Sequence, residues 1–283
     1  MVSLASKTAR LGSPRPLLFC AVLFFFTISP VGALDTSRQI SQYGHTAWRI
    51  EDGVFAGSPN VMAQTTDGYL WIGTQAGLMH FDGVRFVSWQ PPQGIELPSS
   101  RINSLLGARD GSLWIGTSMG LARWRNGNLT NYKDATGSIM AILEDRTGAI
   151  WIARANFSDT KGPLCKATDA GLRCYGRDDG LALPFAVTLA NDPLGNVWLA
   201  GGAMVSRWQT SSADTYVPAG LNPAENFNGV LALAGRPDGS VWVGLVHAGR
   251  GGGLQQLTHG VWKPFVTPEF EGSTLRVTAL LLD

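Results

Sequence analysis

The chain has 283 residues, of which 45% are hydrophobic and 15% charged, and its formal net charge is +1. With 35 glycines and ten tryptophans it can bury a large core while turning often, which is typical of a globular, turn-rich β protein. The nearly neutral charge gives no reason to expect nucleic acid or an anionic membrane surface as a partner.

The N-terminus has the pattern of a secretory signal. Lys7, Arg10 and Arg15 precede an uncharged apolar run from Leu17 to Ile28, and small residues follow, ending at Ala33. We therefore predict that residues 1–33 are a cleaved signal peptide and that the mature chain is periplasmic or otherwise extracytoplasmic. The alternative, an uncleaved anchor helix, needs a span of about 20 apolar residues, and this run is shorter. Cleavage would leave 19 basic against 21 acidic residues.

One short motif recurs along the whole mature chain. It is Asp-Gly-Ser-Leu-Trp-Ile-Gly-Thr at Asp110 to Thr117, and its near-copies are 67–74, 148–153, 195–200 and 238–244. The intervals between the five tryptophans are 43, 37, 47 and 44 residues. This spacing is typical of repeats of four short strands, each of which forms one propeller blade.

The second copy shows how a blade is expected to fold. Alternating apolar residues predict strands at 102–106, 113–117, 120–124 and 129–132, with a hairpin turn at Asp110-Gly111. Applied to all copies, this pattern predicts an all-β protein, a β-propeller of four-stranded blades within residues 34–283. The expected blades are approximately 61–89, 102–132, 139–180, 186–217 and 230–265.

The third and fourth copies depart from the motif. Thr147 and Leu194 stand where the other copies have the turn aspartate, and the third copy carries an insertion from Asn156 to Ala170 that we expect to form a loop. The recurring tryptophan is interpreted as a core residue. The glycine two positions after it would allow a neighbouring strand to approach closely.

The two ends of the array indicate an incomplete ring. The segment Tyr43 to Trp48 resembles an outermost strand without a blade of its own, and such a strand commonly completes the last blade of a closed propeller. At the other end, residues 275–283 resemble the first strand of a sixth, partial blade, whose tryptophan would fall about four to six residues further on. We expect five complete blades and a truncated propeller.

Side chains with catalytic or metal-binding chemistry are scattered. The four histidines, His45, His80, His247 and His259, lie in separate repeats, so we predict no metal and no cofactor. No nucleophile elbow or phosphate-binding loop occurs, and we predict no catalytic residue. Cys165 and Cys174 are separated by eight residues. After export they could form a disulfide, although two free thiols are an equal alternative.

A ligand is expected on the propeller face where loops surround the central opening. The loops that follow second strands and those that precede innermost strands should share this face. Their arginine and asparagine side chains suit hydroxyl-rich or carboxylated ligands such as oligosaccharides. The candidate ligand-binding residues are Asn60, Gln75, Arg101, Ser118, Arg154, Asn156 and His247.

Four segments near the start of the mature chain together resemble the periplasmic two-component regulator propeller. They are the opening Tyr-Gly-His-Thr-Ala-Trp at 43–48, Glu51-Asp52-Gly53, the motif at 67–74 and Phe81-Asp82-Gly83. The resemblance covers about residues 38–283. It implies the sensor region of a bacterial histidine kinase or hybrid two-component system, with a plan of signal peptide, one or two seven-bladed propellers, a β-sandwich, a transmembrane helix and a cytoplasmic kinase.

The resemblance also implies a small-molecule or oligosaccharide ligand, no nucleic acid, a homodimer in the full-length protein, and attachment to the inner membrane through a C-terminal segment that this chain lacks. The chain has no phosphoacceptor box and no ATP lid, so kinase activity would belong to full-length members. Two alternatives stay open. One is a freestanding secreted propeller that acts as a protein scaffold, and the weaker one is a lyase-type propeller enzyme that uses His247.

Overall fold

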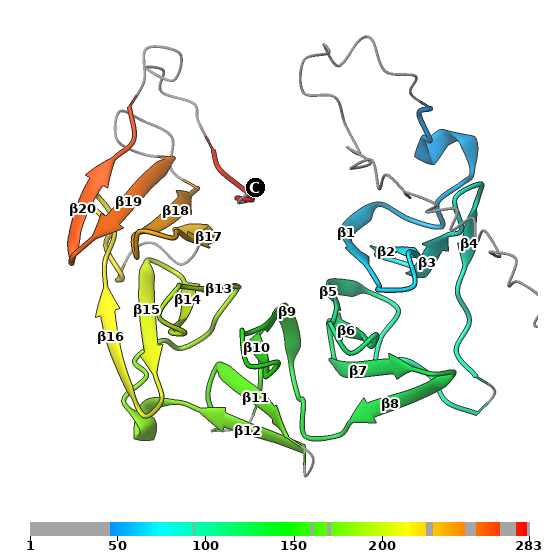
Figure 1. Cartoon of the computed structure of the whole chain (residues 1–283), viewed down its shortest axis with the longest axis horizontal. Helices are drawn as coiled ribbons and strands as arrows, with labels where there is room; N and C mark the ends of the chain where they lie inside the picture. The colour runs from blue at the N-terminus through cyan, green and yellow to red at the C-terminus, as the bar shows by residue number, and fades with distance from the viewer. Residues whose placement is uncertain are drawn as a thin grey trace, which may run out of the picture. The chain divides into compact units, whose positions relative to one another are not determined.

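The computed structural model describes residues 46–92, 94–158, 161–168, 171–224, 229–246, 253–266 and 276–281. The predicted signal peptide, His45 and His247 lie outside the described residues. Within 48–283 the chain folds into five four-stranded antiparallel sheets, and the strands of each sheet follow one another in sequence order (Figure 1). The predicted all-β architecture of propeller blades is confirmed.

The bounds of the strands are as follows. Blade 1 contains β1 (Pro59–Gln64), β2 (Leu70–Thr74), β3 (Gly77–Phe81) and β4 (Phe86–Ser88); blade 2 contains β5 (Ile102–Gly107), β6 (Leu113–Thr117), β7 (Gly120–Arg125) and β8 (Asn128–Tyr132); blade 3 contains β9 (Ser138–Glu144), β10 (Ile150–Ala155), β11 (Leu164–Thr168) and β12 (Gly171–Tyr175); blade 4 contains β13 (Thr188–Asn191), β14 (Val197–Gly201), β15 (Met204–Gln209) and β16 (Ser212–Tyr216); blade 5 contains β17 (Val230–Gly235), β18 (Val241–Leu245), β19 (Leu254–Thr258) and β20 (Val261–Pro264). The described residues also contain two short 3-10 helices, η2 (Ile50–Asp52) and η3 (Arg177–Asp179).

The innermost strands β1, β5, β9, β13 and β17 pack against one another in sequence order, and the core lies between neighbouring blades (Figure 1). Trp71 of blade 1, for example, is buried in the same cluster as Ile102 and Ile115 of blade 2. A Cβ on Gly73 would lie 2.5 Å from Cγ2 of Ile102, so a larger residue there would push the blades apart. The recurring Trp-x-Gly is thus a device for packing one blade on the next.

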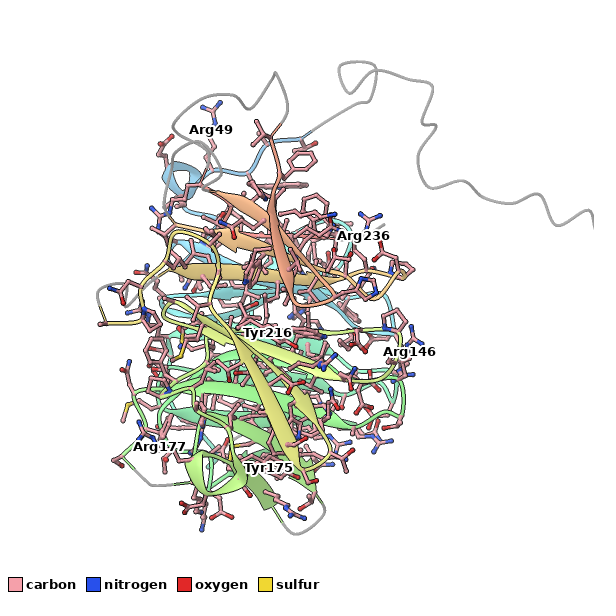
Figure 2. All side chains as sticks on the ribbon, turned by 90° about the vertical axis from the view of Figure 1, so that its left-hand side faces the viewer. Arg49, Arg146, Tyr175, Arg177, Tyr216 and Arg236 are labelled. Atoms are coloured by element: carbon pink, nitrogen blue, oxygen red, sulfur yellow. A yellow bond between two sulfur atoms is a disulfide. The ribbon has the colours of Figure 1, made fainter. Side chains whose placement is uncertain are left out.

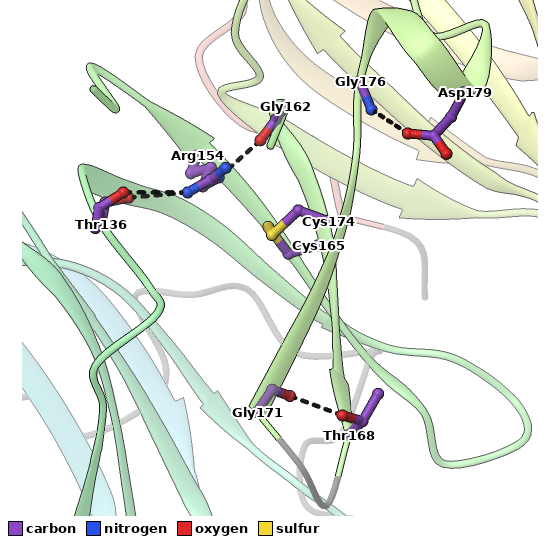
Figure 3. The surroundings of a disulfide bond; sticks show 9 residues. All are labelled: Thr136, Arg154, Gly162, Cys165, Thr168, Gly171, Cys174, Gly176 and Asp179. Atoms are coloured by element: carbon purple, nitrogen blue, oxygen red, sulfur yellow. Dashed lines mark hydrogen bonds between the residues drawn. A yellow bond between two sulfur atoms is a disulfide. The ribbon is translucent and has the colours of Figure 1, made fainter. Parts of the chain in front are cut away.

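The third blade differs from its expected form. Part of the insertion predicted as a loop is β11, which pairs with β10 and β12. The prediction that 156–170 forms a loop was therefore wrong for 164–168. The alternation of residues in this strand is short and lacks an aromatic signal, which is why it was missed. Cys165 and Cys174 are direct partners across β11 and β12 and form a disulfide (Figure 3).

Aromatic contacts at the start of the array repeat those between neighbouring blades. Trp89, which follows the outermost strand of blade 1, packs edge-on against Trp124 of blade 2 with ring centroids 5.2 Å apart. Trp48 packs in the same manner against Phe81 of blade 1, at 5.4 Å. Phe81 and Trp124 hold equivalent positions in β3 and β7. Trp48 therefore takes the place of an outermost-strand aromatic from a preceding blade.

Val277 lies beside blade 5. Its amide donates a hydrogen bond to the Leu245 carbonyl at 3.4 Å, and a Cβ on Gly244 would lie 2.7 Å from Cγ1 of Val277. This is the relation that Ile102 has to Gly73, although residues 276–281 are not part of a regular strand. None of the helices in the described ranges is long and apolar enough to cross a membrane.

Candidate functional site

Loops from two blades converge where the β6–β7 turn meets blade 3. The Ser118 amide donates to the Arg101 carbonyl at 3.0 Å, and the Ser118 hydroxyl lies 2.8 Å from the Ser99 hydroxyl. Across the seam between the blades, the Ser138 hydroxyl donates to the Ser118 carbonyl at 3.0 Å. The turn after the second strand is thus tied to the loops that precede two innermost strands, as expected for loops sharing one face.

A cavity of about 480 Å³ opens at this seam. This volume is in the range of sites for small molecules. Pro98, Met119 and Tyr132 give it apolar surface, while Ser118, Lys133, Thr136 and Asn156 give it polar groups. Two of the residues predicted from the sequence, Ser118 and Asn156, therefore lie together on the wall of one cavity.

The buried side chain of Arg154 holds the Thr136 part of the cavity wall in place. Its side chain is 0% exposed, its Nε donates to the Gly162 carbonyl at 2.7 Å, and its Nη1 donates to the carbonyl and hydroxyl of Thr136 at 3.4 and 3.3 Å (Figure 3). Its guanidinium also lies over the ring of Phe157, 4.4 Å from the centroid. Arg154 was expected to contact ligand, but its donors are directed into the protein. It acts as a positioning residue that fixes the Thr136 loop.

Gly137 lets the same loop approach blade 3. Its φ is +82°, and a Cβ there would lie 2.7 Å from the Ala155 carbonyl oxygen and 2.9 Å from Cα of Phe157. A side chain would meet backbone atoms in a conformation that L residues rarely adopt. The close approach places Thr136 and Asn156 on one cavity wall.

Lys133 is a cavity residue that the sequence analysis did not single out. It follows β8 directly, its side chain is exposed, and no described residue forms an ion pair or hydrogen bond with it. The ends of outermost strands and the starts of innermost strands belong to the same loops, so both can contribute residues to this face. A lysine directly after the outermost strand was the available signal.

The other predicted residues do not reach this cavity. The Asn60 amide donates to the Ile102 carbonyl at 3.2 Å and so links blades 1 and 2. Gln75 is exposed on the β2–β3 turn, and Arg101 is exposed beside Ser118 without lining the cavity. His247 lies outside the described residues.

A second cavity, of about 560 Å³, lies along the same seam. It shares Asn131, Tyr132 and Lys133 with the first, and its other lining residues include Trp114 and Arg123 of blade 2 as well as Thr168 and Gly171 of blade 3. Asp134 also lines it, so this cavity contains both signs of charge.

The turns between first and second strands contain a network of carboxylates. Asp145 accepts hydrogen bonds from the Thr147 amide and hydroxyl and from Nε1 of Trp151 at 2.8 Å, and Asp192 accepts one from Nε1 of Trp198 at 3.0 Å. Burial raises the pKa of Asp145, but these hydrogen bonds outweigh it and hold the pKa below the usual 3.8. The missing turn aspartates of blades 3 and 4 are thus replaced two residues earlier.

The repeat tryptophans are also covered by cations from third strands. Arg123, Lys166 and Arg207 lie over Trp114, Trp151 and Trp198, with the charged groups 5.2, 5.2 and 5.8 Å from the ring centroids. Aromatic residues that end the outermost strands also pack against these rings: Tyr175 lies 6.0 Å from Trp151 and Tyr216 lies 5.9 Å from Trp198, measured between ring centroids (the tyrosines are labelled in Figure 2). These tryptophans are structural, as the sequence predicted.

No three metal-ligating side chains come together in the described part of the chain. The cavity at the seam presents hydroxyl, amide and ammonium groups beside an apolar surface.

Comparison with known proteins agrees with the repeat. Residues 96–119 match the family model for the two component regulator propeller, which confirms the resemblance seen in the sequence. No curated protein matches the chain.

Three solved structures share the fold. Virginiamycin B lyase from Staphylococcus aureus has a TM-score of 0.58 at 15% identity, over 78% of this chain and 73% of the lyase. The extracellular domain of a B. thetaiotaomicron protein assigned as a one component system has a TM-score of 0.56 at 19% identity, over 76% of this chain and 32% of that domain. The corresponding domain of a protein assigned as a hybrid two component system, from the same organism, gives 0.54 at 18%, over 69% and 27%. The chain thus spans about a third or less of these two domains.

Proposed function

We propose that this chain, which carries the two component regulator propeller repeat, is the ligand-binding extracytoplasmic sensor propeller of a two-component histidine kinase. Its ligand is a carbohydrate or another small extracellular cue. Its output is a change in the activity of a kinase that lies outside these residues. The chain itself is not an enzyme.

The observation that carries the proposal is the cavity between blades 2 and 3. Its polar groups come from loops, while its position is set by β6, β8 and β10 of two rigid sheets. A site built in this way can bind a small molecule with little rearrangement of the backbone. The buried hydrogen bonds of Arg154 support the same interpretation.

An extracytoplasmic location has two independent supports. The N-terminal pattern is that of a secretory signal, and the Cys165–Cys174 disulfide is of a kind that persists in oxidising compartments. Expression of the chain with its own N-terminus, followed by mass measurement of the exported protein, tests this directly. We expect a mature chain that begins near residue 34, and retention of residues 1–33 would contradict it.

The downstream parts of the proposal concern the longer protein. Two-component sensors of this plan pass a signal through a transmembrane helix to a kinase, and we propose that the full-length protein is an inner-membrane homodimer. The two similar structures are extracellular domains of signalling proteins, and this chain matches only a part of each.

Ligand binding is tested by thermal unfolding of the exported chain against a panel of sugars, sugar acids and oligosaccharides. A ligand at 100 times its Kd should stabilise the chain by about 2.7 kcal/mol. Met119→Trp, which fills the cavity, should abolish that shift. Gln75→Trp, at the corresponding turn of blade 1, should leave it intact.

Each outcome of this screen has a distinct meaning. A shift that survives Met119→Trp would place the ligand elsewhere. Stabilisation by no small ligand, together with capture of a protein partner, would favour the freestanding scaffold. Turnover of a ligand would favour the lyase-type enzyme.

A further inference from the structure

We infer that the cavity between blades 2 and 3 binds a small hydroxylated monocarboxylate, such as a sugar acid, whose carboxylate pairs with Lys133. The inference rests on the proposed sensor function for its biological meaning. The binding chemistry follows from the cavity itself.

Lys133 brings an unbalanced charge to the cavity. Its ammonium group has no ion pair or hydrogen bond with any described residue, and the residues that line this cavity include no acidic side chain. The neighbouring Asp134 lines the second cavity instead. An anionic ligand would supply the missing partner, whereas a cationic ligand would be repelled.

The number of charges favours a carboxylate over a phosphate. One lysine is the whole charge of the lining, and a carboxylate carries one negative charge. A phosphate monoester carries about −1.5 to −2 at neutral pH, which one ammonium group would leave partly uncompensated. A neutral sugar would leave the lysine without a partner.

Asn156 provides the second free polar group. Its side chain is exposed, lines the cavity and has no hydrogen bond with any described residue. An amide both donates and accepts, which suits a ligand hydroxyl group. Lys133 follows β8 of blade 2 and Asn156 follows β10 of blade 3, so a ligand that contacts both bridges the two blades.

The apolar part of the cavity suits the carbon skeleton of such a ligand. The half-buried ring of Tyr132 is held near Trp114, with centroids 5.2 Å apart, and Pro98 and Met119 lie on the same cavity. An aromatic ring held in this way can pack against the C–H face of a sugar ring.

The experiment is calorimetric titration of the exported chain with gluconate, glucuronate and galacturonate, with glucose, galactose and glucose 6-phosphate as comparison ligands. We expect at least one carboxylate to bind about tenfold more tightly than its neutral counterpart. Added salt should weaken the binding of that carboxylate.

Variants then assign the charge. Lys133→Met should weaken carboxylate binding about tenfold and leave binding of the neutral sugar unchanged. Asn156→Ala should weaken both by roughly fivefold. Lys263→Met, an exposed lysine on β20, is the matched control and should change neither.

The outcomes separate this inference from the proposed function. Equal binding of acid and neutral sugar, tighter binding of glucose 6-phosphate, or normal carboxylate binding by Lys133→Met would overturn the inference. If a neutral oligosaccharide binds while every carboxylate fails, the inference is lost but the sensor proposal stands. If no small molecule binds at all, both are lost.

Discussion

Blades 3 and 5 have the same strand topology, but blade 3 has two stabilising bonds that blade 5 lacks. One is a hydrogen bond from its tryptophan to an aspartate, and the other is a disulfide. In blade 3 the indole of Trp151 donates to Asp145. The equivalent Trp242 of blade 5 has a buried Nε1 with no hydrogen-bond partner among the described residues, and Arg236 stands where the aspartate would be. The disulfide between β11 and β12 corresponds in blade 5 to a Gln255–Pro264 pair.

Blade 4 is intermediate. It keeps the aspartate, as Asp192, and where blade 3 has its disulfide it has a hydrogen bond between Ser206 and Thr215, 2.8 Å long. The three blades thus have the same strand topology but differ in the bonds that link their strands and turns. Of these three blades, blade 3 has the strongest bonds between its strands, and it forms one wall of the candidate site.

The largest effect is expected from loss of the Asp145 carboxylate. Asp145→Ala leaves the Trp151 indole and the turn amides without their acceptor, and we expect a loss of about 3 kcal/mol of unfolding free energy. Denaturant unfolding of the exported chain measures it. Asp178→Ala, at an exposed aspartate on η3, is the control and should have almost no effect. Equal effects of the two variants would show that the tie contributes nothing.

Loss of the disulfide should have the next largest effect. The bond closes a loop with a sequence separation of 9, so replacing both Cys165 and Cys174 by alanine should cost about 2.5 kcal/mol. The matched change in blade 4, Ser206→Ala with Thr215→Ala, removes one hydrogen bond and should cost about 1 kcal/mol. A larger loss in blade 4 than in blade 3 would reverse the ranking of the two blades.

In blade 5 the opposite experiment is possible, in which a hydrogen-bond acceptor is added for the tryptophan indole. In blade 1 the Trp71 indole donates to the Thr65 hydroxyl, which donates to Asp67, and Asp238 is the equivalent of Asp67 in blade 5. Arg236→Thr would introduce a hydroxyl between the Trp242 indole and Asp238. We expect about 1 kcal/mol of added stability by denaturant unfolding. Arg236→Ala should not be stabilising, and if it matched the threonine variant the gain would not come from the hydroxyl.

The fold could be predicted from the sequence because each repeat contains its own copy of the pattern that indicates a four-stranded blade. The Trp-x-Gly pair and the Asp-Gly turn recur, and both have one structural meaning in every blade where they occur. The turns of blades 3 and 4 were harder to interpret, because Asp145 and Asp192 supply the carboxylate while Thr147 and Leu194 stand at the usual aspartate position. The signal for this was an aspartate six residues before the tryptophan in both copies.

The site was predicted less well, because a side chain's direction depends on strand register. Arg154 aligns with Thr74, Thr117 and Leu245, all of which are buried, so the repeat itself places this position inside. The pairing of β10 with β9 is also irregular between Ala153 and Arg154. A shift of one residue in a strand exchanges the inner and outer faces. Ser118 and Asn156 lie beyond the strand ends, where this constraint no longer applies.

The smallest effect is expected on the stability of individual blades when the pH is lowered. Hydrogen bonds lower the pKa of Asp145 and Asp192 below 3.8 in the folded chain despite the opposing effect of burial. A carboxyl group with a lowered folded pKa contributes stability that is fully present above its unfolded pKa and is lost as the pH falls through the folded value. We therefore expect blades 3 and 4 to lose stability as the pH falls below about 3.8.

Hydrogen exchange followed residue by residue between pH 5 and pH 3, and corrected for the intrinsic acid dependence of exchange, would show this loss. Hydrogen bonds from Ser240 also lower the pKa of Asp238 in blade 5, but this carboxylate is solvent-exposed and does not accept from Trp242. Blade 5 should therefore change less over the same range. In Asp145→Asn the acid-dependent loss in blade 3 should shrink, since the amide does not titrate, while that in blade 4 should persist. Equal acid sensitivity of blades 3 and 5 in the unmodified chain would mean that the carboxylate ties do not set the difference between the blades.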